Sequence, residues 1–519
     1  MRGWSAEREG ERAPGFLGSW LPFAVLAGLL VIPYLRYVTD DTYIHMQFAR
    51  NVMRGDGWSF VPGHPTYGFT SALWVEFLAA AGVLGVPLLV AAKGLGMIFT
   101  WISIALFVVI ARELIPSRRG QLAATLAFSV NAWLLRWAIS GMETSLATAL
   151  VLAGIALHLR ERRRDAAPWL SSICWGLATL ARPECLGLVP LAGLDLLCFA
   201  RRRRFLRLAV LALGATAVLV PWGLFLWHEF GQIFPNTAYA KAGSFRLDPA
   251  TVVHVVRREL GLIGATNAGE VVLIGIAVIT VLARDRGRIR PWLGRAALPA
   301  AWMIALPALY AVRGSVLVSR YLVPALGIVV VLGFVAIDYL RERGGPWSGR
   351  APWLAASLFA VQNLLVLYVV ALPPALSFTR GIDDSLVWIG KWAHENTAPE
   401  ATLAVPDIGA VGYYSERTVI DLSGLVTPEM IAAQSGETLD EFVASFGFAK
   451  VARPDYLIDR FTSPDRFASH PELRGVLEML FWRRIGPLGI RRSDDYYYTV
   501  YRIDWDRYDA LPDGRAPGR

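Results

Sequence analysis

The feature that most constrains this chain is a series of long apolar segments. A helix that crosses a bilayer needs about 20 predominantly apolar residues. The sequence predicts eleven such spans, several of them short, at residues 16–38, 87–111, 120–138, 143–159, 168–181, 184–200, 205–228, 268–283, 292–312, 315–339 and 351–372. The fifth and sixth could instead form one broken hairpin. Because 55% of the 519 residues are hydrophobic and only 18% are charged, a multi-pass α-helical membrane protein is expected.

Arginine clusters predict the orientation of these spans, because basic residues collect in cytoplasmic loops. The clusters fall in alternate short loops, around residues 112–119, 160–164, 201–207, 284–290 and 341–350. The N-terminus is therefore expected inside and the C-terminus outside. The net charge of +9 is mostly this topological arginine, and the clusters lack the aromatic interleaving of single-strand binding, so no nucleic-acid partner is expected.

The predicted spans divide the chain into three parts. Residues 1–15 form a cytoplasmic tail, residues 16–375 form a transmembrane domain that includes an outer loop at 39–86, and residues 376–519 form an extracytoplasmic α/β domain. In the outer loop, apolar residues recur at helical spacing after Thr39, which predicts an amphipathic helix on the membrane surface. In the last part, strands are expected at 402–405, 418–421, 456–458 and 496–503, with helices between them.

The outer loop opens with two adjacent carboxylates, Asp40 and Asp41. In a helix they point about 100° apart, so one could take a proton from an attacking hydroxyl while the other holds a metal ion. The alternative is that both only cap the helix and favour its positive end. His45 lies one turn after Asp41 and could be a ligand, or simply a histidine at a wet membrane interface.

Four stretches of this loop carry a resemblance to a known family: D-D-T-Y-I at 40–44, F-A-R-N at 48–51, G-D-G-W-S-F-V-P-G at 55–63 and Y-G-F-T-S-A-L-W at 67–74. They resemble the first outer loop of GT-C fold glycosyltransferases, most closely the bacterial group that includes terminal arabinofuranosyltransferases. Further segments are similar at 140–144, 181–184, 234–241 and 320–324. All four lie outside in the topology predicted from arginine alone. Val61, His64, Ser71 and Cys185 depart from the family pattern, so the resemblance does not identify the sugar.

The resemblance implies a GT-C type fold in a bacterial cytoplasmic membrane. It also implies an inverting transfer of sugar, at the outer face of that membrane, from a polyprenyl-phosphate donor to a cell-envelope glycan or lipid. Asp40 and Asp41 would be catalytic, and Asp41 with Glu143 could hold a divalent ion such as Mg or Mn. The residues expected to bind substrate are His45, Arg50, Tyr67, Glu143, Arg182, Glu184, Asn236, Lys241 and Arg320. An arginine fork pairs well with phosphate oxygens, although a cation near a membrane surface can also only snorkel.

Two other functions compete with an enzyme. A transporter or flippase of a lipid-linked saccharide would place charges near the bilayer midplane in repeated halves, whereas these acids gather at one face and no repeat is evident. A noncatalytic scaffold would not need an intact acid pair. In the C-terminal part, Asp407 and Asp421 follow predicted strands, where they could bind sugar or form turns.

Overall fold

The computed structural model describes residues 15–200, 202–236, 248–314, 317–343, 349–434, 436–470, 473, 475–485 and 496–511. The chain forms two compact units. The membrane body comprises residues 1–35, 93–222 and 246–372, and the head unit comprises residues 36–92, 223–245 and 373–519. The predicted outer loop therefore clusters with the C-terminal α/β part, whereas the sequence had suggested that it belongs to the transmembrane domain.

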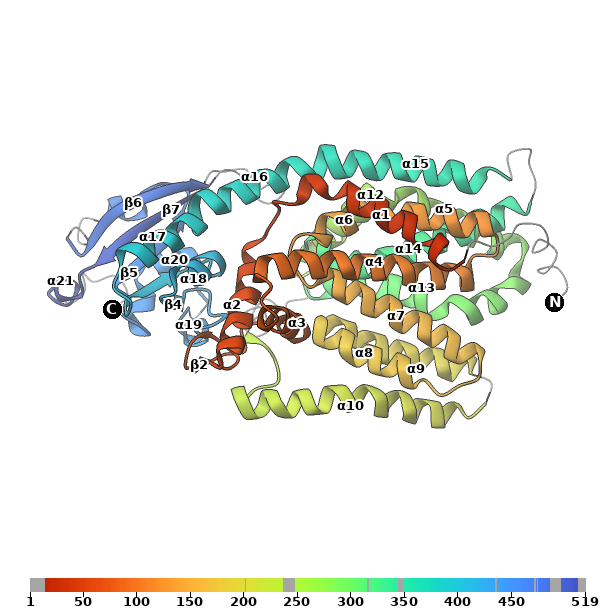
Figure 1. The fold of residues 1–519 in the computed structure, drawn as a ribbon, viewed down its shortest axis with the longest axis horizontal. Helices are drawn as coiled ribbons and strands as arrows, with labels where there is room; N and C mark the ends of the chain where they lie inside the picture. The colour runs from red at the N-terminus through yellow and green to blue at the C-terminus, as the bar shows by residue number, and fades with distance from the viewer. Residues whose placement is uncertain are drawn as a thin grey trace. The chain divides into compact units, whose positions relative to one another are not determined.

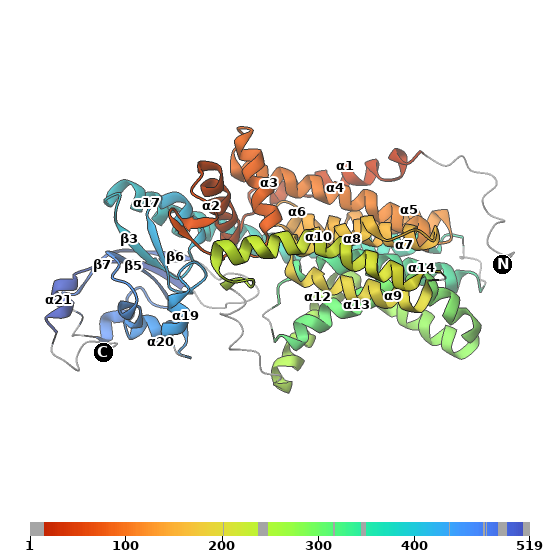
Figure 2. The ribbon, with the colours of Figure 1, turned by 90° about the horizontal axis from the view of Figure 1, so that it is seen from below.

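The membrane body is helical throughout its described residues. Its elements are η1 (Leu17–Ser19), α1 (Leu21–Leu30), η2 (Ile32–Tyr34), α4 (Leu88–Leu114), α5 (Arg118–Ser129), α6 (Ala132–Ala138), α7 (Thr144–Arg163), α8 (Trp169–Ala181), η3 (Pro183–Gly187), α9 (Leu188–Phe199), α10 (Arg204–Phe230), α12 (Pro249–Arg284), η4 (Arg286–Arg288), α13 (Ile289–Val312), η5 (Ser319–Tyr321), α14 (Val323–Arg341), α15 (Ala351–Leu365) and η6 (Val366–Ala371). Helix α14 is almost wholly buried and packs against α7, α12 and α13 (Figures 1 and 2).

Six helical stretches of the described chain are long and apolar enough to cross a membrane: Leu88–Leu114, Arg204–Phe230, Pro249–Arg284, Arg286–Val312, Val323–Arg341 and Ala351–Asn396. The protein is thus a multi-pass membrane protein. The other five predicted spans coincide with shorter, interrupted or more polar helices. The span predicted at 120–138, for example, is broken at Asn131, whose side chain caps α6 by accepting the N–H of Leu134 at 3.2 Å. The count of eleven remains a prediction.

Helix α12 is broken at Asn267, whose φ of −137° and ψ of 22° are not helical. A break inside a bilayer exposes carbonyl groups that need donors. Three side chains supply them: Trp133 donates to the carbonyl of Leu262 at 2.8 Å, Gln362 to those of Gly264 and Ala265 at 3.0 and 2.9 Å, and Asn363 to that of Thr266 at 2.9 Å. The break is therefore encoded by polar residues on α6 and α15.

A five-stranded mixed sheet organises the head unit. Its strands are β3 (Thr402–Val405), β4 (Thr418–Asp421), β5 (Tyr456–Phe461), β6 (Leu477–Ile485) and β7 (Tyr496–Ile503), in the order β4-β3-β5-β7-β6. Strand β3 runs parallel to β4 and β5, and β7 runs antiparallel to β5 and β6. The structure confirms the predicted α/β domain, and the edge strand β6 is the strand of this sheet that sequence patterns missed.

Helices cover both faces of this sheet. The remaining elements of the head unit are α2 (Asp40–Arg54), β1 (Ser59–Val61), β2 (His64–Pro65), α3 (Ala72–Val83), α16 (Leu372–Ile382), η7 (Asp383–Val387), α17 (Trp388–Asn396), α18 (Gly409–Ser415), α19 (Glu429–Gln434), α20 (Leu439–Ala444), η8 (Gly447–Lys450), η9 (Arg466–Ser469) and α21 (Trp505–Asp509). On one face, Leu457 and Tyr501 pack with Phe442 and Phe446 in an apolar core. On the other face, Trp392 of α17 contacts Tyr456.

Helix α2 differs from its prediction. The sequence predicts a helix on the membrane surface, but nine of its 15 residues are buried. It packs against α3 and α18 within the head unit. The apolar face of α2, which the sequence predicts to lie on the membrane, is thus covered by other helices of the head unit.

Candidate active site

Asp40 is the first residue of α2, and its carboxylate is held by another element of the head unit. It accepts the backbone N–H groups of Gly409 at 2.9 Å and Ala410 at 2.8 Å, at the start of α18. A Cβ atom on residue 409 would lie 2.1 Å from the Asp40 carbonyl oxygen, so only glycine permits this approach. The two donors fix the orientation of the carboxylate.

Two further acids lie at the carboxyl ends of the parallel strands, where α/β folds commonly place their sites. Asp407 follows β3 and accepts hydrogen bonds from Arg460 at 2.5 Å and from the Tyr498 hydroxyl at 2.6 Å. Asp421 ends β4 and accepts three backbone N–H groups, from Ser423, Leu425 and Val426, at 2.8, 2.5 and 3.0 Å. Asp421 therefore builds a turn, whereas Asp407 belongs to a network of ionisable side chains.

Burial is the main influence on the pKa values of Asp40 and Asp421. It raises the pKa of Asp40 to about 7; the negative charge of Asp407 adds to the rise, the N–H of Ala410 opposes it, and Asp41 adds a smaller contribution. Burial also raises the pKa of Asp421 to about 6, against the three N–H groups that favour its charged form. A carboxylate with a pKa near 7 can exchange protons at neutral pH, as a general base must.

The neighbouring residues Asp41 and His45 lie on α2 as predicted. Asp41 is half-buried in the first turn of the helix. The Nδ1 atom of His45 lies 3.0 Å from the carbonyl oxygen of Asp41, and the ring is only 5% exposed. This contact belongs to the helix itself, so it supports a local packing role for His45 and leaves a ligand role as a prediction.

Three other predicted substrate residues connect segments of the head unit. Arg50 forms a 3.0 Å ion pair with Glu416, and its guanidinium lies 4.5 Å from the centre of the Tyr413 ring. Tyr67 stacks on Phe230 with ring centres 5.5 Å apart. Asn236 donates its side-chain N–H to the carbonyl of Leu425 at 2.9 Å and its backbone N–H to that of Tyr67 at 2.9 Å. These contacts stabilise the unit that contains Asp40.

A second polar cluster lies in the membrane body. Arg182 donates to Glu143 at 3.0 Å, to Glu184 at 2.6 Å and to the hydroxyl of Tyr310 at 3.3 Å. Tyr310 in turn donates to Glu184. The second carboxylate oxygen of Glu143, Oε2, is buried and has no hydrogen-bond partner among the described residues. The cluster therefore retains one unused acceptor.

Tyr321 joins Arg320 to this cluster. The guanidinium of Arg182 lies 4.9 Å from the centre of the Tyr321 ring, and that of Arg320 lies 5.2 Å from it. Both guanidinium groups thus lie against one aromatic ring, and the charge of Arg182 is already opposed by Glu143 and Glu184. Sequence analysis missed Tyr310, because a tyrosine within an apolar helix carries no distinguishing signal.

The predicted site residues thus fall into two groups. Glu143, Arg182, Glu184 and Arg320 come together in the membrane body, and the residues from Asp40 to Tyr67 lie with Asn236 in the head unit. Lys241 lies outside the described residues. The tentative metal pair Asp41 and Glu143 is divided between the two units. Within the described chain, no three His, Cys, Asp or Glu side chains gather in a way that could hold a metal ion.

Sequence analysis also missed Arg460 and Tyr498, the partners of Asp407. Both lie on strands of the sheet, and nothing in the sequence distinguishes either from other strand residues. Their alternation in the strand places them on one face, but nothing local indicates which acid they meet. Asp407 itself carried a signal, since acids directly after parallel strands often mark sites.

A helical multi-pass body joined to an α/β head is the architecture of GT-C membrane glycosyltransferases, and the fold predicted from the resemblance is confirmed. The structure is similar to that of ArnT from Cupriavidus metallidurans bound to undecaprenyl phosphate, with a TM-score of 0.60 and 13% identity over 93% of this chain and 98% of that one. An oligosaccharyltransferase from Archaeoglobus fulgidus also matches with a TM-score of 0.60 and 13% identity, over 86% of this chain and 69% of its own. The archaeal enzyme has also been crystallised with zinc and sulfate.

Among curated proteins, the chain has a homologue in the terminal beta-(1->2)-arabinofuranosyltransferase of Mycobacterium tuberculosis. The two are 27% identical over 379 residues, which is 63% of this chain and 59% of the relative. The match therefore spans less than two thirds of that enzyme. Residues 380–501 match a family described as "Domain of unknown function (DUF8728)".

Proposed function

We propose that this protein is a glycosyltransferase that moves a sugar from a polyprenyl-phosphate donor to a cell-envelope glycan or lipid at the outer face of the membrane. The observation that carries the proposal is the Asp40 carboxylate, which is oriented by two backbone N–H groups and has a pKa near neutrality. The mycobacterial relative supports an arabinofuranosyl donor, and thus pentosyl transfer.

In this mechanism Asp40 is the general base. It accepts the proton of an acceptor hydroxyl while that oxygen attacks the anomeric carbon of the donor sugar. The bond between the anomeric carbon and the phosphate oxygen breaks, polyprenyl phosphate leaves, and the configuration inverts. The N–H groups of Gly409 and Ala410 orient the carboxylate, and its remaining lone pairs can receive the proton. Asp41 would bind sugar or acceptor beside it.

The membrane-body cluster would bind the donor. Arg182 and Arg320 would stabilise the phosphate as negative charge develops on it, and Lys241 stays a predicted donor-binding residue. Glu143 holds Arg182 in place, and its unused Oε2 atom would accept a hydroxyl of the donor sugar. The undecaprenyl phosphate bound to ArnT supports a donor of this chemical class.

The proposed mechanism uses no divalent ion, and experiment can test whether transfer needs Mg or Mn. The donor atoms of the described residues do not form a site that fits one, so no step is assigned to a metal. Transfer measured after exhaustive treatment with a chelator, with and without added ions, tests this directly. Recovery with Mg or Mn alone would show that transfer needs a divalent ion.

Sugar transfer by the purified protein tests the proposal. The full chain in detergent is supplied with a panel of polyprenyl-phosphate sugars and envelope-glycan acceptors, and wild type is compared with Asp40→Asn and Asp41→Asn. We expect Asp40→Asn to lose at least about a hundredfold in kcat, the usual contribution of a general base. Glu478→Gln, which removes an acid exposed on β6, is the matched control. Normal transfer by Asp40→Asn would refute its role as base.

One observation favours a second function, transport of a lipid-linked saccharide. Transporters bind their substrates at broken helices, and α12 is broken at Asn267, beside the wholly buried Glu270. The discriminating assay follows a fluorescent lipid-linked sugar across the membrane of proteoliposomes. Translocation without transfer to any acceptor would favour the transporter.

A further inference from the structure

A groove of about 400 Å³ lies along the first helices of the membrane body, apart from both polar clusters described above. It is lined by three aromatic and five aliphatic side chains, from the segment around α1 and from one side of α4. Ile98, Ile102, Ala105 and Val109 follow one another at helical spacing on α4. Trp101 from the same helix lies against Gly28 of α1, where a Cβ would be 3.6 Å from its ring. Its lining presents no polar surface, so it fits a hydrocarbon chain.

Polar groups lie beside this groove. Arg112, one turn beyond Val109 on α4, donates to the hydroxyl of Ser19 at 2.9 Å, and its guanidinium lies 5.5 Å from the centre of the Phe16 ring. Arg112 forms no ion pair with any described carboxylate, and its neighbour Glu113 is paired with Arg163 at 2.9 Å. A cation without an acidic partner remains available to an anion.

Trp20 supplies an independent sign of a missing ligand. This residue lines the groove and follows Ser19 in the chain. Its indole N–H is buried and has no acceptor among the described residues. Buried donors are almost always satisfied, so an acceptor oxygen is expected there.

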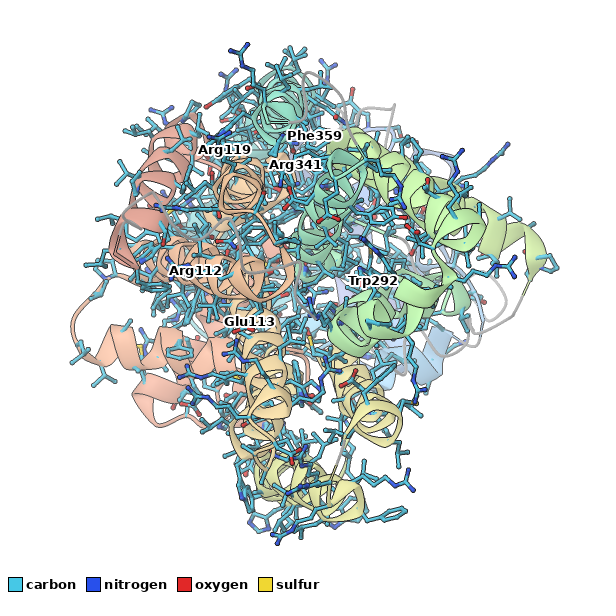
Figure 3. All side chains as sticks on the ribbon, turned by 90° about the vertical axis from the view of Figure 1, so that its right-hand side faces the viewer. Arg112, Glu113, Arg119, Trp292, Arg341 and Phe359 are labelled. Carbon is cyan, nitrogen blue, oxygen red and sulfur yellow. The ribbon has the colours of Figure 1, made fainter. Side chains whose placement is uncertain are left out.

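We infer that the groove binds an anionic membrane phospholipid. An acyl chain lies along α4 against Trp101 and Ala105, the phosphate pairs with Arg112, and the Trp20 indole donates to a phosphate or ester oxygen. The apolar groove accounts for the chain, the unneutralised arginine for the negative charge, and the orphan donor for the oxygen. Figure 3 labels Arg112 beside Glu113, and that carboxylate is already paired with Arg163.

Native mass spectrometry of the full chain in detergent tests this inference. The protein is titrated with phosphatidylglycerol or with phosphatidylcholine of identical acyl chains. We expect tighter binding of phosphatidylglycerol, and about a tenfold loss of that affinity in Arg112→Gln, which corresponds to one charge-assisted hydrogen bond. Ala105→Phe, which fills the groove without changing charge, should lose a similar factor.

Two matched variants control for nonspecific effects. Arg284→Gln removes an exposed arginine at the end of another span, and Val278→Phe enlarges an exposed apolar residue of α12. Both should bind phosphatidylglycerol as wild type does. Equal binding of the two phospholipids, or full binding by Arg112→Gln and Ala105→Phe, would overturn the inference. Preferential binding of polyprenyl phosphate that Ala105→Phe abolishes would also overturn it, by assigning the groove to the carrier lipid.

Discussion

At the scale of single residues, the two adjacent aspartates of α2 have different surroundings. Both are half-buried, but Asp40 accepts two backbone N–H groups from α18 and lies close enough to Asp407 for that charge to raise its pKa. Position in the helix alone could not separate them, because both lie in its first turn. The two carboxylates differ because the first backbone N–H groups of α18 donate hydrogen bonds to Asp40.

The raised pKa of Asp40 leads to a prediction about pH. Below about 7 the carboxylate is protonated and cannot act as a base, so kcat/KM should rise about tenfold per pH unit in acid and level off above pH 7. The negative charge of Asp407 contributes to the raised pKa, so Asp407→Asn should move the acidic limb to lower pH. Glu478→Gln should leave it in place. A limb that stays or moves to higher pH in Asp407→Asn would contradict the assignment.

At the scale of elements, close packing between α2 and α18 depends on Gly409. In Gly409→Ala the new methyl group overlaps the Asp40 backbone and carboxylate, so α18 must move away. We expect a loss of about 2 kcal/mol in stability, typical of overpacking, and a marked loss of transfer. Thermal unfolding and sugar transfer are measured together. Gly275→Ala, where nothing lies within 4 Å of the new methyl group, is the control. It should leave transfer unchanged and should not lower stability, because alanine favours the interior of a helix more than glycine does.

The break in α12 leads to a second prediction at this scale. Asn363→Leu removes the donor to the Thr266 carbonyl and the acceptor of the Ala132 N–H, which lies 2.9 Å from Asn363 Oδ1. A buried hydrogen bond between membrane helices contributes about 1 kcal/mol, so the variant should lose about 1 to 2 kcal/mol. Unfolding in detergent is the measurement. Leu358→Ala, on the exposed side of α15, should cost less; an equal loss in both would show that the break needs no side-chain donors.

The sequence predicts a helix or strand correctly where the residues of that element carry a clear hydrophobic pattern by themselves. Strand β7 was predicted with its bounds, because a run of tyrosine, threonine and valine favours a strand. Strand β6 was missed, since its charged pair Arg483 and Arg484 interrupts the alternation expected of a half-buried strand. Helix α2 was predicted with nearly the right bounds but the wrong surroundings. Its apolar stripe shows that something covers it, and only the fold shows that α18 does.

The same limit applies to the candidate site. Asp40 could be found because it lies in a recognisable motif, and Glu143, Arg182 and Arg320 for the same reason. Arg460, Tyr498 and Tyr310 could not, because their partners lie 53, 91 and 126 or more residues away. Side-chain pairs of such separation leave no periodic pattern in one sequence.

At the scale of the whole molecule, the arginine clusters predict an N-terminus inside and a head unit outside. In a cysteine-free background, a cysteine at Arg453 in the head unit should react with a membrane-impermeant maleimide in intact cells. A cysteine at Arg164, after α7, should react only after the membrane is opened. The native cysteines at 174, 185 and 198 must be replaced first. The opposite labelling pattern would invert the topology and exclude transfer at the outer face.

The contact between Asp40 and α18 also concerns the order of events during synthesis. The two partners lie 369 residues apart, so at about 5 to 20 residues per second roughly 20 to 75 s pass between the appearance of α2 and that of the helix that covers it. During this interval α2 can pack against α3, which follows it closely in the chain, but its contact with α18 cannot form. A nascent chain that stops before residue 409 would lack the two backbone donors that hold Asp40, so the last quarter of translation determines when this carboxylate reaches its final surroundings.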